Sequence, residues 1–412
     1  MAVNDLTFEQ ASTFLNDVKE QMTGEKSIAP ANTEEFVAVG TTVLKTGYDP
    51  ILNAINQVLS RTIFSIRDYS AKFRLAEITE TAFGNHTRKI SIADRPIVDD
   101  ERYKYPMAYD GTQNPANGDG LSVDMYRIRK QDVLQTNFYG SQVFEDWYTL
   151  YKDQLECAFR NPAEMGRFVT MITMNHNNKL TQYREAAGRA VLLNFIGGIL
   201  DEGDSATLYT ELTHRIIPLL TLYNNATGLS LTRADVYKPA NFRAFVQFTY
   251  SIMMQVSSLM EQRSIKYQTI VNGKNVQRHT PKANQKMHIL EKFRAEWDMM
   301  GLANTYHNGF LVLPGGIRVE DVAFWQSIEA PESIDVIPSR IGSNGSVVVG
   351  TEQEAAVIAT LYDEEALGYA TTQSWSAPTP FNAAGGYTNY WVHETERTYN
   401  DHSEKGVVFT LS

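Results

Sequence analysis

The segment between Asn161 and Gly198 restricts the fold of this 412-residue chain more than any other stretch. Asn161 is suited to an N-cap and Pro162 to the first helical position, whereas the pair Gly197-Gly198 favours a stop. One helix between these signals would be about 50 Å long at roughly 1.5 Å per residue. Apolar residues hold one face at both ends, while the middle, NHNNK, is polar and allows a kink or a bridging segment. The pattern predicts a long helix at about 162–197.

The N-terminal part predicts two amphipathic helices separated by polar linkers. Thr7 and Gln10 form a capping box at the start of an apolar stripe, and the polar stretch TGEKSIAPAN follows this first helix. A second helix is predicted from about Pro50 to Phe64. Such helices are typical of an arm that docks on another surface, and packing on their own domain is an equally good interpretation.

Residues 78–137 predict a long two-stranded projection. TRKISIA alternates as a strand, and a second strand is predicted in SVDMYRIRK, which ends at Lys130. The segment between them has no periodicity, yet it carries Tyr103, Tyr105 and Met107. That is too much apolar surface for a solvated linker, and a loop of this length in a compact domain is usually functional. We therefore expect a partner surface to order the tip.

The stretch VIATLYDEEALGYATT, residues 357–372, predicts a small acidic element on a strand tip. Its apolar beginning favours a buried strand, and Asp363 then stands where a helix N-cap would. Glu364 and Glu365 would lie in the first turn, and Gly368 would be the C-cap. A one-turn helix of this kind would be an exposed, negatively charged knob.

The rest of the chain after Gly203 alternates between helical and extended patterns. Helices are predicted in LYTELTHRIIPLLTLY, PANFRAFVQFTYSIMMQVSSLMEQ and PKANQKMHILEKFRAEWDMMG, and strands in YQTIVNG, GFLVLPGGIRVED and SVVVGT. The tail, NYWVHETERTYNDHSEKGVVFTLS, predicts two extended runs around a polar turn.

Charge and cysteine content exclude several functions. The net charge of −11 argues against a general nucleic-acid binder, because such a protein needs a basic footprint, and RIRK at 127–130 is the one basic run. The sole cysteine, Cys157, excludes an internal disulfide and a cysteine-based zinc cage, and it fits a reducing cytoplasm. The N-terminus lacks the pattern of a signal peptide, and the apolar run AVLLNFIGGIL is too short to cross a bilayer. The sequence thus predicts a soluble protein with no membrane partner.

The sequence contains no recognisable constellation for catalysis. His288 and Glu291, on the helix predicted from about Pro281, could supply two metal ligands, but no further ligand completes that site. Nucleophile elbows, phosphate-binding loops and dinucleotide motifs are missing from the sequence. We therefore predict no catalytic residue, no metal, no cofactor and no enzyme. A second polar group in WVHETE and NDHSE is typical of a solvated face; it comprises His393, Glu394, Glu396, Asp401 and His402.

The order of these parts resembles the major capsid protein of tailed bacteriophages, with the Hong Kong 97-type fold, and is most like those of small short-tailed phages. The resemblance implies an α+β fold that covers essentially the whole chain. Its implied parts are an N-terminal arm at 1–77, an extended hairpin loop at 78–137, a peripheral domain at 138–205 with a spine helix at about 162–197, an axial domain at 206–380 with interposed peripheral strands, and C-terminal strands at 381–412 that return to the peripheral domain.

The resemblance also implies a function. Copies of the chain would join into pentamers and hexamers and form the icosahedral shell around the double-stranded DNA genome, with the extended loop lying across an adjacent subunit and the turn at Asp363–Gly368 acting as a hub element. The partners would be the chain itself, a separate scaffolding protein, a portal protein and non-specifically contacted DNA. Assembly would occur in the bacterial cytoplasm and the product would be the virion. No site for a Lys–Asn isopeptide bond can be matched.

Charged and aromatic side chains of the loop and the acidic turn are the predicted subunit contacts. Opposite charges at DDE, 99–101, and RIRK, 127–130, would fix register across subunits, or they would pair within their own hairpin. Two other functions stay open: an encapsulin-like nanocompartment shell, and a cytosolic α/β enzyme with an unrecognised site. The predicted contact residues are Asp99, Asp100, Glu101, Tyr103, Tyr105, Tyr109, Arg127, Arg129, Lys130, Asp363, Glu364 and Glu365.

Overall fold

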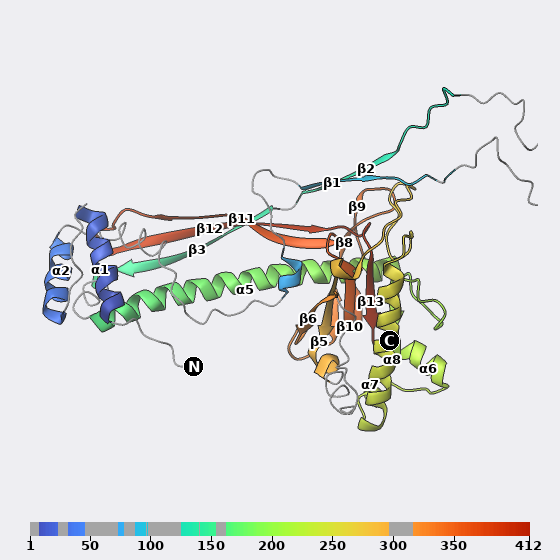
Figure 1. Ribbon diagram of the computed structural model, residues 1–412. Helices are drawn as coiled ribbons and strands as arrows, with labels where there is room; N and C mark the ends of the chain where they lie inside the picture. The colour runs from blue at the N-terminus through green and yellow to red at the C-terminus, as the bar shows by residue number, and fades with distance from the viewer. Residues whose placement is uncertain are drawn as a thin grey trace, which may run out of the picture. The chain divides into compact units, whose positions relative to one another are not determined.

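The computed structural model describes residues 8–23, 32–45, 73–77, 87–95, 97, 125–139, 141–153, 162–295 and 316–412 (Figure 1). These residues fall into two compact units. Unit 1 takes its residues from Met1–Asn85, Gly140–Leu192 and Leu367–Tyr399, and unit 2 from His86–Tyr139, Leu193–Ala366 and Asn400–Ser412. Both helices and sheets are present, so the predicted α+β class is confirmed. Within the described ranges, no helix has an apolar run long enough to span a bilayer.

A three-stranded sheet forms the centre of unit 1 (Figure 1). Its strand order is β11-β12-β3, and β12 pairs with β3 antiparallel from Tyr387↔Tyr151 to Arg397↔Ser141. The strands are β3 (Ser141–Tyr151), β11 (Leu367–Pro378) and β12 (Tyr387–Asn400), and the helical elements of this unit are α1 (Phe8–Thr23), α2 (Thr33–Lys45), η1 (Arg74–Ala76) and the larger part of α5 (Pro162–Glu202).

One face of this sheet packs on α5. The rings of Phe144 on β3 and Tyr183 on α5 lie 3.8 Å apart between centroids. Asp146 on β3 accepts a hydrogen bond of 3.1 Å from Lys179 and lies 3.3 Å from His176 Nδ1. The polar middle of the helix, NHNNK, is therefore where α5 binds the sheet, as the predicted bridging segment requires, and the helix continues through it.

Helix α5 begins at the predicted Pro162 but does not end at the two glycines. It continues to Glu202, so the predicted stop is wrong. A Cβ on Gly197 would lie 2.6 Å from Val336 Cγ2, and a Cβ on Gly198 would collide with the ring of His402. The glycines thus serve close packing inside the helix rather than its termination.

One of the two helices predicted in the N-terminal part is confirmed, and the arm itself stays a prediction. Helix α1 lies where the first amphipathic helix was predicted. Helix α2 was missed, because the linker that precedes it hides an N-cap: Asn32 Oδ1 accepts the Glu35 amide at 2.9 Å, and Asn32 Nδ2 donates to Glu35 Oε1 at 3.2 Å. The helix predicted from about Pro50 to Phe64 lies outside the described residues.

Unit 2 is organised around a sheet of order β4-β13-β10-β5-β6, with β7 also paired to β10. Helix α6 packs on β4, β13 and α8, with the rings of Tyr223 and Phe245 5.4 Å apart. The strands of this sheet are β4 (Ile216–Pro218), β5 (Gln285–Leu290), β6 (Arg318–Val322), β7 (Ser333–Val336), β10 (Gln353–Asp363) and β13 (Gly406–Thr410), and the other elements are β8 (Ser339–Ile341), β9 (Val347–Val349), α6 (Leu219–Thr227), α7 (Arg233–Val236), α8 (Pro239–Met260) and η2 (Lys282–Asn284).

Several predictions in unit 2 are confirmed and others are wrong. Helix α8, with Pro239 at its start, and the strands β6, β9, β12 and β13 lie in the predicted windows. The helix predicted from Pro281 to Gly301 is wrong in its first half, which forms η2 and the buried strand β5, whereas residues 291–295 are helical as predicted. The helix predicted over 208–223 is divided between β4 and α6, and YQTIVNG forms turns rather than a strand, with Tyr267 at φ 67°.

The predicted projection is a two-stranded hairpin in unit 2. Strand β1 (Thr87–Ile92) pairs antiparallel with β2 (Val133–Phe138), from Thr87↔Phe138 to Ile92↔Val133. The first strand is confirmed, but the second was predicted too early, since 125–132 is not a strand and pairing with β1 selects the next six residues. We call β1, β2 and the described residues next to them, 93–95 and 125–132, the hairpin.

Candidate functional site

Strand β1 of the hairpin has the reverse of the usual polarity. Side chains alternate across a strand, and here Lys89, Ser91 and Ala93 point toward the body of unit 2. Ile90 and Ile92 point away from it and are 56% and 61% exposed. Strand β2 has the usual polarity, since Leu134 is buried and Gln135 is exposed.

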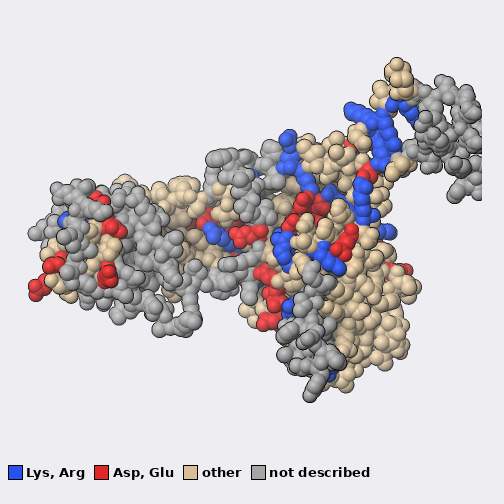
Figure 2. Space-filling view, viewed as in Figure 1, with Lys and Arg blue, Asp and Glu red and all other residues tan. Residues whose placement is uncertain are grey.

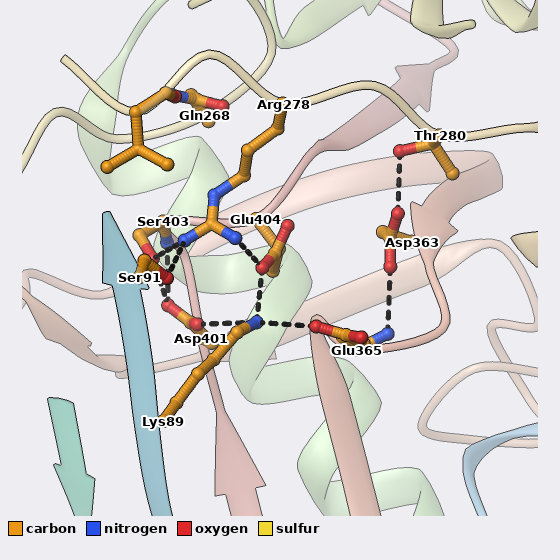
Figure 3. Close-up of polar contacts among 11 residues, drawn as sticks. Lys89, Ser91, Gln268, Arg278, Thr280, Asp363, Glu365, Asp401, Ser403 and Glu404 are labelled. Atoms are coloured by element: carbon orange, nitrogen blue, oxygen red, sulfur yellow. Dashed lines mark hydrogen bonds and ion pairs between the residues drawn. The ribbon is translucent and has the colours of Figure 1, made fainter. Parts of the chain in front are cut away.

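Lys89 is the main polar contact between the hairpin and the body (Figure 3). Its Nζ atom lies 3.2 Å from Asp401 Oδ2 and 3.2 Å from Glu365 Oε2, and it donates a hydrogen bond to Glu404 Oε1. Burial lowers the pKa of Lys89, but the carboxylates of Asp401 and Glu404 raise it more, so its pKa lies above the ordinary value. Lys89 therefore stays charged.

Arg278 completes this cluster from the other side. Its guanidinium donates to Glu404 and to Ser403 Oγ at 3.2 Å, and it reaches Ser91 Oγ on β1 at 3.4 Å. Asp401 Oδ1 in turn accepts the Ser403 hydroxyl at 2.6 Å. We call Lys89, Arg278, Glu365, Asp401 and Glu404 the hairpin anchor; it joins two cations to three carboxylates.

The turn that supplies Asp401 and Glu404 is buried, and the predicted solvated face is therefore wrong. Asp401 and His402 have no exposed surface, and Glu404 is buried as well. His402 stacks on Phe195 at 5.1 Å, and burial together with the charge of Arg215 lowers its pKa to about 3, so it is neutral. The polar tail tolerates burial because its charges find partners brought from distant parts of the chain.

The acidic turn between β10 and β11 also differs from the prediction. Asp363 ends β10 and Leu367 begins β11, so no helix forms and Gly368 lies within a strand rather than at a C-cap. Asp363 is buried, and its two oxygens accept the Thr280 hydroxyl at 2.7 Å and the Glu365 amide at 2.9 Å (Figure 3). Hydrogen bonds to the carboxylate stabilise a tight turn where a capped helix was predicted.

The other two acids of this turn bind cations of unit 2. Glu364 pairs with Arg318, and Glu365 belongs to the hairpin anchor. The predicted helix is wrong, but exposure is confirmed in part: the side chain of Glu365 is 68% exposed and that of Glu364 34%, although both make contacts within their own unit. A contact of Asp363, Glu364 or Glu365 with a second copy stays a prediction.

The hairpin is held at a second point near its outer end. Asp94 donates its amide to the Asn275 carbonyl at 2.8 Å and accepts the Gln277 amide at 2.6 Å. Lys274 Nζ donates to the Val133 carbonyl at 2.6 Å. Each strand of the hairpin is thus tied to the same loop of unit 2.

The remaining predicted contact residues divide into two groups. Arg127, Arg129 and Lys130 are exposed on the described part of the projection, where Figure 2 shows basic side chains in blue. Pairing of the RIRK run with the DDE run stays a prediction, because the acidic and aromatic loop residues lie outside the described ranges: Asp99, Asp100, Glu101, Tyr103, Tyr105 and Tyr109.

A second acidic pair lies in unit 1. Glu394 and Glu396 on β12 are each 2% exposed, so the predicted solvated face is wrong here too. Arg184 on α5 donates to Glu394 Oε1 at 3.0 Å. Burial and the neighbouring charge of Glu394 raise the pKa of Glu396 to about 7. We call Glu394 and Glu396 the acid pair.

His288, one of the two residues weighed as metal ligands from the sequence, binds within the protein. His288 lies on β5 instead of a helix, and its ring is 2.8 Å from the Tyr362 hydroxyl and 3.7 Å from Glu320. Burial and the nearby charge of Lys286 lower its pKa to about 3. Among the described residues, the carboxylates of Asp335, Glu352 and Glu354 could hold a cation, but they are exposed, and such acidic groups are common without an ion.

Sequence reasoning missed Lys89 and Arg278. Lys89 lies in a predicted strand and is followed by Ile90, so the alternation alone favours burial of the isoleucine. The signal that could have indicated the reverse is the surplus of acids in the distant NDHSE turn, which needs cations if it is buried.

A family model described as Phi29-like phage major capsid protein matches residues 12–410. No curated protein sequence matches the chain. Solved structures similar to it include the capsid of Staphylococcus phage Andhra, at 11% identity and a TM-score of 0.49 over 85% of this chain and 88% of that one. A chain of bacteriophage P68, from a structure of its head fiber and inner core protein, has 10% identity and a TM-score of 0.49 over 85% and 88%. The mature capsid of bacteriophage PhiM1 has 8% identity and a TM-score of 0.44 over 85% and 89%.

Proposed function

Because the chain belongs to the Phi29-like phage major capsid proteins, and is therefore a shell-forming protein of a tailed phage, we propose that its copies join into pentamers and hexamers through the hairpin. These rings would close the icosahedral shell around a double-stranded DNA genome. Rings need heterologous contacts, in which one surface of a copy meets a different surface of the next. A projection that leaves the body of its own unit is suited to such a contact.

The observation that carries this proposal is the apolar surface of the projection. Met125, Tyr126 and Ile128 are each at least 80% exposed, and Ile90 and Ile92 add to them on β1. Monomeric proteins rarely expose contiguous apolar patches of this kind, and such patches mark interaction sites. The neighbouring basic residues Arg127 and Arg129 would then fix the register of the contact.

We also propose a division of the chain into five parts. We assign 1–77 to an arm, 78–137 to the extended loop, 138–205 to a peripheral domain, 206–380 to an axial domain and 381–412 to returning strands. The position of α5, which begins at Pro162, supports a spine helix in the third of these.

The proposed partners are further copies of the chain, a separate scaffolding protein, a portal protein and packaged DNA. The net charge of −11 supports a wall that DNA contacts without adhering, because release of counterions requires a basic surface. We place assembly in the cytoplasm of the bacterial host.

We also propose that the chain has no catalytic activity. A cavity of about 450 Å³ in unit 2 is lined by residues that include Arg233, Asp335 and Glu354, and neither a histidine nor a cysteine is among its lining residues. The serines of the lining, Ser327 and Ser333, therefore have no histidine among these residues to act as a general base.

The test is to remove the loop and look for particles. Deletion of residues 98–130 removes Met125, Tyr126 and Ile128 and spares both points that hold the hairpin, so we expect a folded, soluble protein that forms no shells in negative-stain microscopy. The matched control replaces 98–130 by a Gly/Ser segment of equal length, which keeps the reach of the loop and removes its chemistry. Normal shells from the deletion variant would contradict the proposal.

A further inference from the structure

The reversed polarity of β1 calls for a physical cause. Burial of an isoleucine side chain is favourable, so β1 alone should turn Ile90 and Ile92 inward, whereas β2 favours the observed face, on which Leu134 is buried. A one-residue change of register moves every side chain of a strand to the opposite face. In the observed arrangement the exposed side carries Ile90, Ile92 and Val133, which we call the outer stripe.

The hairpin anchor supplies the cause. A turned β1 would remove Lys89 from three carboxylates, of which Asp401 and Glu404 are buried. Asp401 would then lose the cation at 3.2 Å, and Glu404 would keep Arg278 alone, and a buried charge that loses its partner is strongly destabilising. The anchor and the burial of Leu134 on β2 therefore select together the face that the hairpin presents.

The placement of the hairpin also depends on its base. A two-stranded ribbon alone is marginally stable in water, and β1 and β2 pair with each other and with no third strand in the described part of the chain. Asp94 and Lys274 hold the outer end, and the anchor holds the inner end. Because contacts hold both of its ends, the hairpin keeps a single orientation on unit 2.

We propose that Lys89 is a positioning residue for assembly, holding the outer stripe away from its own body so that the stripe packs on a second copy of the chain. This inference rests on the proposed function. The occupant is a second copy because the stripe is apolar and uncharged, and the chain belongs to proteins that join their own copies. A heterologous contact needs a different apolar surface on the next copy, and Val347 and Val349, exposed on β9, offer one.

The first experiment removes the stripe without adding charge. The Ile90→Ser/Ile92→Ser variant should fold with an unchanged Tm, because both side chains are exposed. Its critical concentration for particle formation, measured by light scattering, should rise at least about tenfold, which is about 1.4 kcal/mol per contact. The matched control, Leu229→Ser/Leu259→Ser, removes two exposed leucines elsewhere in unit 2 and should assemble like the parent chain. An unchanged critical concentration of the isoleucine variant overturns the proposal.

The second experiment separates positioning from stability. Lys89→Met/Glu404→Gln removes one charge of each sign, so the net charge of the anchor is kept and the body should fold. We expect faster hydrogen exchange at the amides of 89–92 and a tenfold rise in the critical concentration. Lys238→Met, which removes an exposed lysine, is the control and should change neither.

The two variants should not be additive. If Lys89 acts only by presenting the stripe, the quadruple variant loses no more assembly than the isoleucine variant alone. Additive losses would mean that Lys89 acts by another route and would overturn its assigned role. If the isoleucine variant loses assembly only in the presence of a scaffolding protein, that protein is the occupant of the outer stripe. This outcome overturns the contact with a second copy.

Failure of the proposed function can be distinguished from failure of this inference. If the parent chain forms no particles with or without a scaffolding protein, the proposed function fails. If the parent forms particles and all the variants do so equally well, this inference fails alone.

Discussion

The hairpin anchor in unit 2 and the acid pair in unit 1 bury the same kind of side chain with different results. Both draw on the same polar stretch of the tail, 393–405. In the anchor, Lys89 and Arg278 meet three carboxylates; Lys89 stays charged, and burial raises the pKa of Glu404 against the opposing charges of Lys89 and Arg278. In the acid pair, Arg184 binds Glu394, and burial and the charge of Glu394 raise the pKa of Glu396 to about 7. Both clusters thus hold an acid whose pKa is raised by burial, and they differ in the number of cations that oppose this rise.

The largest change in stability is expected when Lys89 is removed from the anchor. Lys89→Met leaves Asp401 and Glu404 with Arg278 alone, and breaking a buried pair in this way costs about 3–5 kcal/mol. Urea unfolding should show this loss, and Lys89→Met/Glu404→Gln should recover part of it. A loss below about 1 kcal/mol would show that the anchor contributes little to stability.

Neutralising Glu396 of the acid pair should change stability less, and in the opposite direction: the variant should be more stable than the parent chain, by an amount that depends on pH. The pKa of Glu396 is raised from 4.5 to about 7, so between these values the folded unit holds a proton that the unfolded chain has lost. The contribution of Glu396 to stability is therefore greatest below pH 4.5 and is lost as the pH rises through 7. Glu396→Gln should be more stable than the parent chain by about 1–2 kcal/mol at pH 8, and the difference should shrink toward pH 5.

The measurement is the free energy of unfolding in urea at several pH values, followed by tryptophan fluorescence. Glu145→Gln is the matched control, because Glu145 lies on the same sheet with a side chain 53% exposed. A pH slope that is the same in the parent and the Glu396→Gln variant would mean that Glu396 is not the titrating group.

The smallest effect is expected at the half-exposed pair of Arg318 and Glu364. Exposed ion pairs contribute about 0–1 kcal/mol, since water screens the charges, so Glu364→Gln should shift the unfolding free energy by about 0.5 kcal/mol or less. A loss as large as that of Lys89→Met would contradict the distinction between this exposed pair and the buried acids of the anchor.

The sequence could predict the elements whose signals are local. The start of α5 follows from Pro162, α8 from Pro239, and β1 from the alternation of TRKISIA. Strand β5 could not be predicted, because residues on both of its faces are buried and neither helical nor extended periodicity results. The glycines at 197 and 198 gave the signal of a helix end, while the structure uses them for contact with Val336 and His402.

The candidate site could be predicted only in part, since its contacts are long-range. The sequence of residues 78–137 predicted the projection and its apolar loop. The sequence did not predict the burial of Asp401 and Glu404, because this burial depends on Lys89 and Arg278, which lie far away in the sequence. A polar turn with distant cations has the same composition as a solvated turn, so local patterns cannot distinguish the two.

The position of β13 has a consequence for biosynthesis. This strand lies between β4 and β10 in the sheet, yet it comes later in the sequence than all of its neighbours. On the ribosome, the sheet of unit 2 must therefore wait for residues 406–410, and the hairpin must wait for Asp401 and Glu404, before either can be fixed. An incomplete polypeptide thus lacks both a central strand of this sheet and the carboxylates that bind Lys89.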